Sequence, residues 1–267
     1  MHVYKNRVSS TYPHAILLGY AFSMIWPIII TFKDYAQSNL RKHLLFISFI
    51  MVCICLYFTE SRGPWAGSLI GFFLLFTLGS NRYRKKLLLA VFLFLSVLII
   101  RPQVTTTLSN LFHSTFDVNT LKGRSYNYRF ELWYKAYDEI SKSRLRLFFG
   151  YGDNSHHYLD LSGYEKATNR PSYFWSWDSE YAVILLERGI LGLFAFCLLY
   201  IFVFFRTFKI YLRGSLLKKD LILSFLSGIL VFLFMMTNVK VFSPQLFGLF
   251  WLIVAIVSST RNAQEVR

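Results

Sequence analysis

Residues 181–205 read YAVILLERGILGLFAFCLLYIFVFF, an apolar run interrupted by a single pair of charged residues. Its length lies in the range of roughly 17 to 25 apolar residues that a helix needs to cross a hydrocarbon core about 30 Å thick. In lipid, backbone polar groups must be satisfied within the chain, either in helices or in a closed barrel of alternating strands. The run does not alternate, so it predicts a membrane-spanning helix.

Six other apolar segments without alternation accompany this run. They lie near residues 14–32, 43–59, 64–80, 86–101, 221–238 and 243–259. The 267 residues are 55% hydrophobic and 19% aromatic, more than a soluble domain usually carries. We therefore predict an all-α, polytopic bundle of about seven transmembrane helices, although the second to fourth segments are short enough to be re-entrant or buried core helices instead.

The predicted bundle divides into a four-helix part at 1–101 and a three-helix part at 181–267, with one large loop at 102–180 between them. The formal net charge is +15, yet the stretch from Arg101 to Glu180 is nearly neutral, with ten basic and nine acidic residues. The remaining positive charge lies in short clusters in and between the apolar segments, so it does not indicate nucleic-acid binding.

Short basic clusters at 33–42, 82–86 and 206–219 decide the orientation. The positive-inside rule places them in the cytoplasm, whereas a loop of more than about 60 residues is translocated largely regardless of its charge. The pattern predicts a multi-pass plasma (inner) membrane protein with an extracytoplasmic large loop and a cytoplasmic C-terminus. The same topology puts Met1–Pro13 outside with no preceding helix to carry it there. We therefore expect that the chain is the C-terminal part of a longer membrane protein.

Three motifs lie in or beside the predicted outer loop. The first, TESRGPW at 59–65, places Arg62 at the outer end of a span, with Pro64 suited to the first turn of the next helix. An arginine at the centre of a span costs about 2.5 to 3.5 kcal/mol, and less near its end. Arg62 therefore either binds an anion or snorkels to the interface.

The second motif, RFELW at 129–133, opens a segment that ends at Ile140. Aromatic residues recur through the segment at helical spacing, which predicts a short amphipathic helix on the membrane surface with the aromatic stripe as its buried face. The stripe consists of Phe130, Trp133, Tyr134 and Tyr137. Arg129, on the first turn, is placed to reach a lipid headgroup. The GYG sequence at 150–152 indicates a turn rather than a phosphate cradle.

The third motif, WSWDSEY at 175–181, leads directly into the apolar run. Desolvation at the mouth of a hydrophobic helix raises a carboxylate pKa toward the working pH, so Asp178 and Glu180 are candidate general bases. Asp178 is also suited to cap the helix, assisted by Ser179. Trp175 and Trp177 suit either an interfacial aromatic belt or a platform for sugar rings.

Metal ligation is not indicated by the sequence. Cys53, Cys55 and Cys197 lie inside predicted helices without metal-ligand spacing, and we interpret them as small packing residues. His156 and His157 have no Cys or His partner at ligand spacing, and we interpret them as loop residues. We therefore predict neither a metal nor another cofactor.

Taken together, the motifs resemble those of the O-antigen ligase and polymerase family. The shared features are SRG at 61–63, an arginine four residues before Trp133, GYG at 150–152 and DSEYAVILLERGILGL at 178–193. The resemblance runs from about Ser61 to Gly192 and, through the helix pattern, to the C-terminus. It implies further helices upstream of Met1.

The resemblance implies a metal-independent glycosyltransferase that takes a glycan from polyprenyl pyrophosphate on the outer leaflet. The family's motif arginines carry over to Arg62 and Arg129, which would hold the pyrophosphate because guanidinium groups bind phosphate bidentately and stay protonated. Asp178, or failing it Glu180, would remove the proton from the attacking sugar hydroxyl. Arg188 would orient Asp178 or neutralise the neighbouring glutamate.

Ligases of this family carry a His-Asn pair where Asp178-Ser179 stands here. This difference favours a polymerase that joins undecaprenyl pyrophosphate-linked oligosaccharide repeat units. The alternatives are a ligase that attaches finished glycan to lipid A-core or to protein, a transporter, and a non-functional fragment. The implied partners are a lipid-linked glycan donor, an acceptor glycan and the lipid bilayer, together with a chain-length regulator and a flippase.

Overall fold

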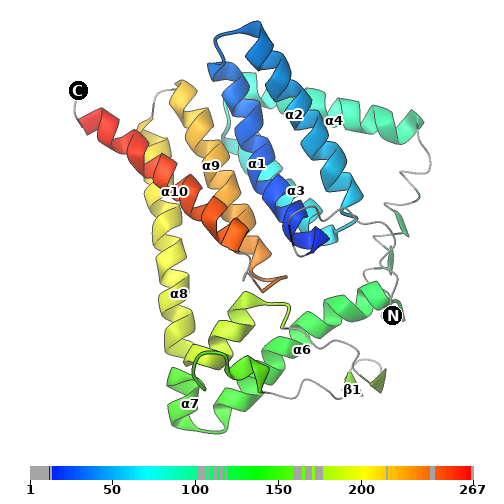
Figure 1. The fold of residues 1–267 in the computed structure, drawn as a ribbon, viewed down its shortest axis with the longest axis vertical. Coiled ribbons are helices and arrows are strands. Elements are labelled where there is room, and N and C mark those ends of the chain that lie inside the picture. The colour runs from blue at the N-terminus through cyan, green and yellow to red at the C-terminus, as the bar shows by residue number, and fades with distance from the viewer. Residues whose placement is uncertain are drawn as a thin grey trace. The chain divides into compact units, whose positions relative to one another are not determined.

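The computed structural model of the protein describes residues 12, 14–100, 119–158, 164–165, 170–171, 177–214, 216–240 and 244–265, with a few positions between 106 and 117. In chain order the elements are α1 (Ala15–Tyr35), α2 (Asn39–Phe58), α3 (Arg62–Leu78), α4 (Asn81–Ile100), α6 (Leu121–Ser141), α7 (Arg144–Phe149), η1 (Ser155–His157), β1 (Tyr164–Glu165), β2 (Arg170–Pro171), α8 (Glu180–Arg213), α9 (Leu216–Met235) and α10 (Pro244–Glu265) (Figure 1). The two short strands form one antiparallel pair, and helices make up nearly all the rest. The predicted all-α class is confirmed.

Each of the seven predicted apolar segments coincides with a helix, namely α1 to α4 and α8 to α10. Among the described helices, α1, α2 and α8 are long and apolar enough to cross a membrane, and α10 contains a shorter apolar stretch, Pro244–Ser259. Only Val52 of α2 is buried, and large apolar side chains cover much of the remaining surface of that helix. Such a surface suits lipid rather than water, which supports a membrane protein.

The chain forms two compact units. Unit 1 contains residues 1–90, 200–235 and 241–267, and unit 2 contains residues 91–199 and 236–240. Helices α4 and α8 each run from one unit into the other. The predicted site residue Arg62 belongs to unit 1, whereas those near the third motif belong to unit 2.

Unit 1 is held together by close packing of α1, α3 and α9, which contact one another (Figure 1). Glycines line the face of α3 that meets α9: Gly67 lies against Val231, and a Cβ on Gly71 would overlap the Ser227 hydroxyl. Small residues let helix backbones approach closely. Van der Waals packing of this kind drives association in lipid, where apolar side chains gain little by leaving the solvent.

We expect Gly71→Leu to destabilise unit 1, because overpacking of this kind typically costs about 1 to 3 kcal/mol. The temperature at which the detergent-solubilised protein aggregates, followed by size-exclusion chromatography after heating, should fall. Gly248→Leu on α10 is the matched control, because no atom lies within 4 Å of a Cβ at that position. Equal losses in both variants would contradict the packing interpretation.

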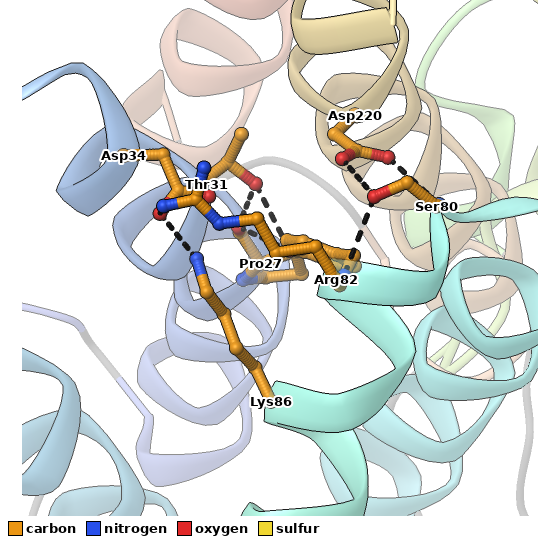
Figure 2. Close-up of polar contacts among 8 residues, drawn as sticks. Pro27, Thr31, Asp34, Ser80, Arg82, Lys86 and Asp220 are labelled. Atoms are coloured by element: carbon orange, nitrogen blue, oxygen red, sulfur yellow. Dashed lines mark hydrogen bonds and ion pairs between the residues drawn. The ribbon is translucent and has the colours of Figure 1, made fainter.

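Polar side chains join α1, α4 and α9 at one end of unit 1 (Figure 2). Asp34 of α1 pairs with Arg82 at 3.3 Å and also with Lys86, both near the start of α4. Asp220 of α9 accepts the Ser80 N–H at 3.0 Å and the Ser80 hydroxyl at 2.5 Å, directly before α4 begins. These contacts hold the end of α1 and the starts of α4 and α9 together.

The same contacts bear on the predicted topology. Tyr211 donates a hydrogen bond to the Leu78 carbonyl at 2.8 Å, which brings the end of α8 to the end of α3. The basic clusters at 33–42, 82–86 and 206–219 therefore lie at one end of unit 1, as a single topology requires. The side of the membrane that this end faces stays a prediction.

Helix α6 in unit 2 is amphipathic, with two distinct faces. Phe130, Tyr134 and Tyr137 of the aromatic stripe are 53%, 68% and 56% exposed, so the stripe is not the face packed on the protein, and its burial in the membrane surface stays a prediction. The buried residues recur every four positions instead, at Tyr128, Leu132, Ala136 and Ile140. They pack on Trp177 and the first turns of α8, and Trp133 of the aromatic stripe packs against the edge of the same cluster. The exposed aromatic face remains available to lipid.

Candidate functional site

Helix α6 begins earlier than the sequence predicted, and the additional residues belong to the candidate site. Its N-cap is Thr120, whose hydroxyl accepts the Gly123 N–H at 3.0 Å. Arg124 is 6% exposed and lies one turn before Tyr128 on the buried face. Arg124 is not among the predicted site residues, although its spacing of four from Tyr128 is the signal that would have found it. Its guanidinium is a second fixed positive charge on α6, five residues before Arg129.

Arg129 is half-buried on α6. Its Nε is buried and makes no hydrogen bond to any described residue. A buried N–H without a partner is uncommon in proteins, and a guanidinium is always protonated. The atom is therefore suited to an oxygen of an anion, in agreement with the predicted role of Arg129.

Asp178 lies half-buried between the core residue Trp177 and the start of α8. Burial raises the pKa of Tyr128 on α6, and the nearby carboxylates of Asp178 and Glu131 raise it further. The carboxylate of Asp178 is therefore within electrostatic reach of the buried face of α6. A carboxylate oxygen is a hydrogen-bond acceptor, so Asp178 can face a substrate hydroxyl group at this position.

The start of α8 is capped by Ser179. Its hydroxyl accepts the Ala182 N–H at 3.4 Å, and its carbonyl accepts the Val183 N–H at 3.2 Å. The sequence assigned this cap to Asp178 with Ser179 assisting, but Ser179 supplies these contacts itself.

Glu180 has surroundings different from those of Asp178. Its backbone N–H donates to the Met236 carbonyl at 2.9 Å. Burial lowers the pKa of Lys240, and the carboxylates of Glu180 and Glu187 oppose this effect. The charge of Glu180 is thus partly balanced by Lys240. Of the two predicted bases, Asp178 stays the first candidate because its carboxylate lies near the Tyr128 hydroxyl.

Arg62 is the first residue of α3 in unit 1 and is half-buried, whereas the preceding Thr59 and Ser61 are buried. The first turn of a helix carries free N–H groups and the positive end of the helix dipole, so an anion is favoured there. Both predicted roles of Arg62, anion binding and snorkelling, fit this position.

The GYG sequence and the Glu187-Arg188-Gly189 sequence form one crossing of two backbones in unit 2. Helix α8 is interrupted at Gly189, whose φ of 65° and ψ of −168° are essentially restricted to glycine. A Cβ on Gly189 would overlap the Phe148 carbonyl, and a Cβ on Gly150 would overlap the Glu187 carbonyl. The apolar run that predicted one uninterrupted helix therefore breaks at Gly189.

The crossing also satisfies the end of the first part of α8. The N–H groups of Tyr151 and Gly152 donate to the carbonyls of Leu186 and Glu187 at 3.0 Å and 2.9 Å. Carbonyl groups at a helix end lack partners within the helix, so the GYG turn replaces those partners. The predicted turn at 150–152 thus has a structural role.

Glu187, which is 8% exposed, anchors the loop that follows the crossing. Its Oε1 accepts the Asn154 N–H at 2.8 Å and contacts His156 Nδ1 at 2.5 Å. On the other side of the ring, His156 Nε2 contacts Lys240 Nζ. Burial lowers the pKa of His156; the hydrogen bond to Glu187 opposes this effect and the charge of Lys240 reinforces it.

His156 lies outside the long helices, as predicted, but it is buried, a property that the sequence did not predict: it is 4% exposed within η1. No sequence signal joins it to Lys240, which is 84 positions away.

The remaining predicted site residues have other surroundings. Arg188 pairs with Asp153 at 3.2 Å, in an exposed contact that involves neither Asp178 nor the neighbouring glutamate. Trp177 is 5% exposed and donates its indole N–H to the His156 carbonyl at 3.1 Å. Its ring packs in the core of unit 2 and presents no open face to a sugar, so an aromatic platform at Trp177 is not supported. Trp175 lies outside the described residues.

Comparison with known proteins identifies the family. A family model described as O-antigen ligase matches residues 46–197, which is more than half of the chain. The matched range includes Arg62, Arg129, the backbone crossing at Gly150 and Gly189, and Asp178. No curated protein and no solved structure matches the chain. The motifs and the family match agree, and this chain belongs to the O-antigen ligase family.

Proposed function

We propose that this protein is a polymerase that joins undecaprenyl pyrophosphate-linked oligosaccharide repeat units at the outer face of the plasma membrane. Membership of the family supports a role in surface-polysaccharide synthesis. The Asp178-Ser179 pair favours the polymerase over the ligase. The observation that carries the proposal is the half-buried Asp178 carboxylate near Tyr128, in the same unit as Arg129.

The proposed reaction is a displacement at the anomeric carbon of the donor glycan. A hydroxyl oxygen of the acceptor sugar bonds to that carbon, the bond from the carbon to the pyrophosphate oxygen breaks with its electron pair, and the hydroxyl proton passes to Asp178. Arg62 and Arg129 stabilise the negative charge that gathers on the departing pyrophosphate. Because these guanidinium groups supply the positive charge, the proposed mechanism uses no metal ion.

The proposal includes seven transmembrane helices, an extracytoplasmic loop at 102–180 and a cytoplasmic C-terminus. The gathering of three basic clusters at one end of unit 1 supports this topology. The donor and acceptor glycans would then meet the loop at the outer leaflet, and a flippase would deliver the donor there. A chain-length regulator is a further proposed partner.

Complementation of a deletion strain tests the proposal, with the surface glycan separated on gels. Loss of a polymerase should leave single repeat units attached to the core, and the wild-type gene should restore the ladder of longer chains. A core that carries no repeat unit at all in the deletion strain would assign the chain to the ligase alternative, which the description of the matched family favours.

In the same strain, Arg129→Ala is expected to lower polymer formation by roughly a hundredfold or more, because it removes a charge that faces the leaving group. Arg144→Ala is the matched control, since Arg144 is exposed on α7 in the same unit. A normal ladder with Arg129→Ala would contradict the proposed pyrophosphate contact.

A further inference from the structure

The side chains of Glu187, His156 and Lys240 form a continuous chain of contacts, in which Glu187 and His156 are buried and Lys240 is half-buried. None of the three has a part in the proposed reaction. The donor and acceptor capacities of its members determine the protonation of the histidine. An ionised glutamate only accepts hydrogen bonds and a lysine ammonium only donates them. His156 must then donate through Nδ1 to Glu187 and accept through Nε2 from Lys240, which is the neutral ring with its proton on Nδ1.

The same residues connect three separate segments of unit 2. The His156 carbonyl accepts the Trp177 indole N–H at 3.1 Å. Two residues after Asp178, the Glu180 N–H donates to the Met236 carbonyl at 2.9 Å. The contact of His156 with Lys240, four residues after Met236, closes a ring of contacts around the segment that carries Asp178. We call this ring of contacts the frame.

We propose that His156 is a positioning residue that, in its neutral form, ties the Lys240 segment to Trp177 and so holds the Asp178 carboxylate in place for glycan transfer. This inference rests on the proposed function, because it assigns Asp178 the role of the base. A displacement of about 1 Å at a reacting group lowers a rate by roughly a hundredfold, so a loosened frame affects kcat more than binding.

Protonation of His156 would break the frame at Lys240. The charged groups that face the ring are Glu187 from α8, Lys240 from the segment after α9, and His157 from its own loop. A second proton on Nε2 would point an N–H group at the Lys240 ammonium, whereas the contact with Glu187 would persist. The pKa of His156 lies below the ordinary value of about 6.5. Neutral His156 therefore contributes fully to folding above about pH 6.5, and stability falls as the pH drops from there toward the lower folded pKa.

The test uses the full chain in detergent with a polyprenyl pyrophosphate-linked repeat unit, and measures kcat, KM and thermal stability between pH 5 and 8. Wild type should lose kcat at low pH by about tenfold or more with little change in KM. His156→Gln provides a donor and an acceptor without titrating. It should keep a rate within about threefold of wild type at pH 8 and show a weaker fall at low pH. His43→Gln is the matched control and should keep the wild-type profile, because His43 is exposed on α2 of unit 1 and takes no part in these contacts.

His156→Ala should lower kcat by about tenfold or more at every pH while KM changes little. A wild-type kcat in His156→Ala, or an unaltered low-pH fall in His156→Gln, would overturn the positioning role and leave the proposed function standing. Absence of joining by wild type at every pH would overturn the proposed function and with it the role of His156 in catalysis. The pH dependence of thermal stability would then still test whether protonation of His156 weakens its contact with Lys240.

Discussion

Replacing Asp178 by asparagine is expected to abolish polymer formation. Asparagine has nearly the same shape but does not accept the hydroxyl proton, and loss of a general base typically lowers kcat by about 10² to 10⁴-fold. KM for the lipid-linked donor should change little, because the proposed pyrophosphate contacts come from Arg62 and Arg129. Rates of joining by the purified variant, together with its thermal stability, separate lost chemistry from lost folding.

Two matched variants sharpen this result. Asp138→Asn makes the same change at an exposed position of α6 and should keep the wild-type rate. Glu180→Gln should lower the rate less than Asp178→Asn, because the charge of Glu180 is partly balanced by Lys240. If Glu180→Gln lost the activity and Asp178→Asn kept it, the base would be Glu180.

Replacing Gly189 by alanine is expected to prevent unit 2 from folding. The backbone angles at Gly189 cost an alanine about 1 to 3 kcal/mol, and the overlap of its Cβ with the Phe148 carbonyl adds about 1 to 3 kcal/mol more. The sum is a large part of the roughly 5 to 15 kcal/mol by which proteins are stable. We expect little detergent-soluble protein and rapid proteolysis at the GYG turn.

Gly152→Ala separates the cost of the backbone angles from the cost of the Cβ overlap. Gly152 also has a positive φ, of 97°, but no atom lies within 4 Å of a Cβ there, so this variant should lose less stability than Gly189→Ala. Gly150→Ala alters the other backbone segment of the same crossing, and its loss of stability should resemble that of Gly189→Ala. Because the two sites share their partners, the double variant should lose less than the sum of the single losses. Normal expression of Gly189→Ala would contradict the observed break in α8.

The helices could be predicted because each depends on a property of its own segment. A hydrocarbon core requires a run of apolar residues of a certain length, wherever in the fold that run lies. The packed face of α6 could not be predicted in this way. The aromatic stripe and the stripe through Leu132 and Ala136 both have helical spacing. The second stripe is the packed one because it contacts the start of α8, a segment distant in the sequence.

The sequence by itself determined the all-α class and the family, and it proposed Arg62, Arg129 and Asp178 as site residues, because hydropathy, charge and ordered motifs are read along one dimension. Only the tertiary structure decided that the GYG turn and Gly189 are two halves of one crossing, and that His156 meets Lys240. It alone also showed that Asp178 lies near Tyr128 and that Glu180 lies near Lys240. The physical reason is that burial and the pairing of charges depend on which distant segments fold against each other, and no local pattern encodes that choice.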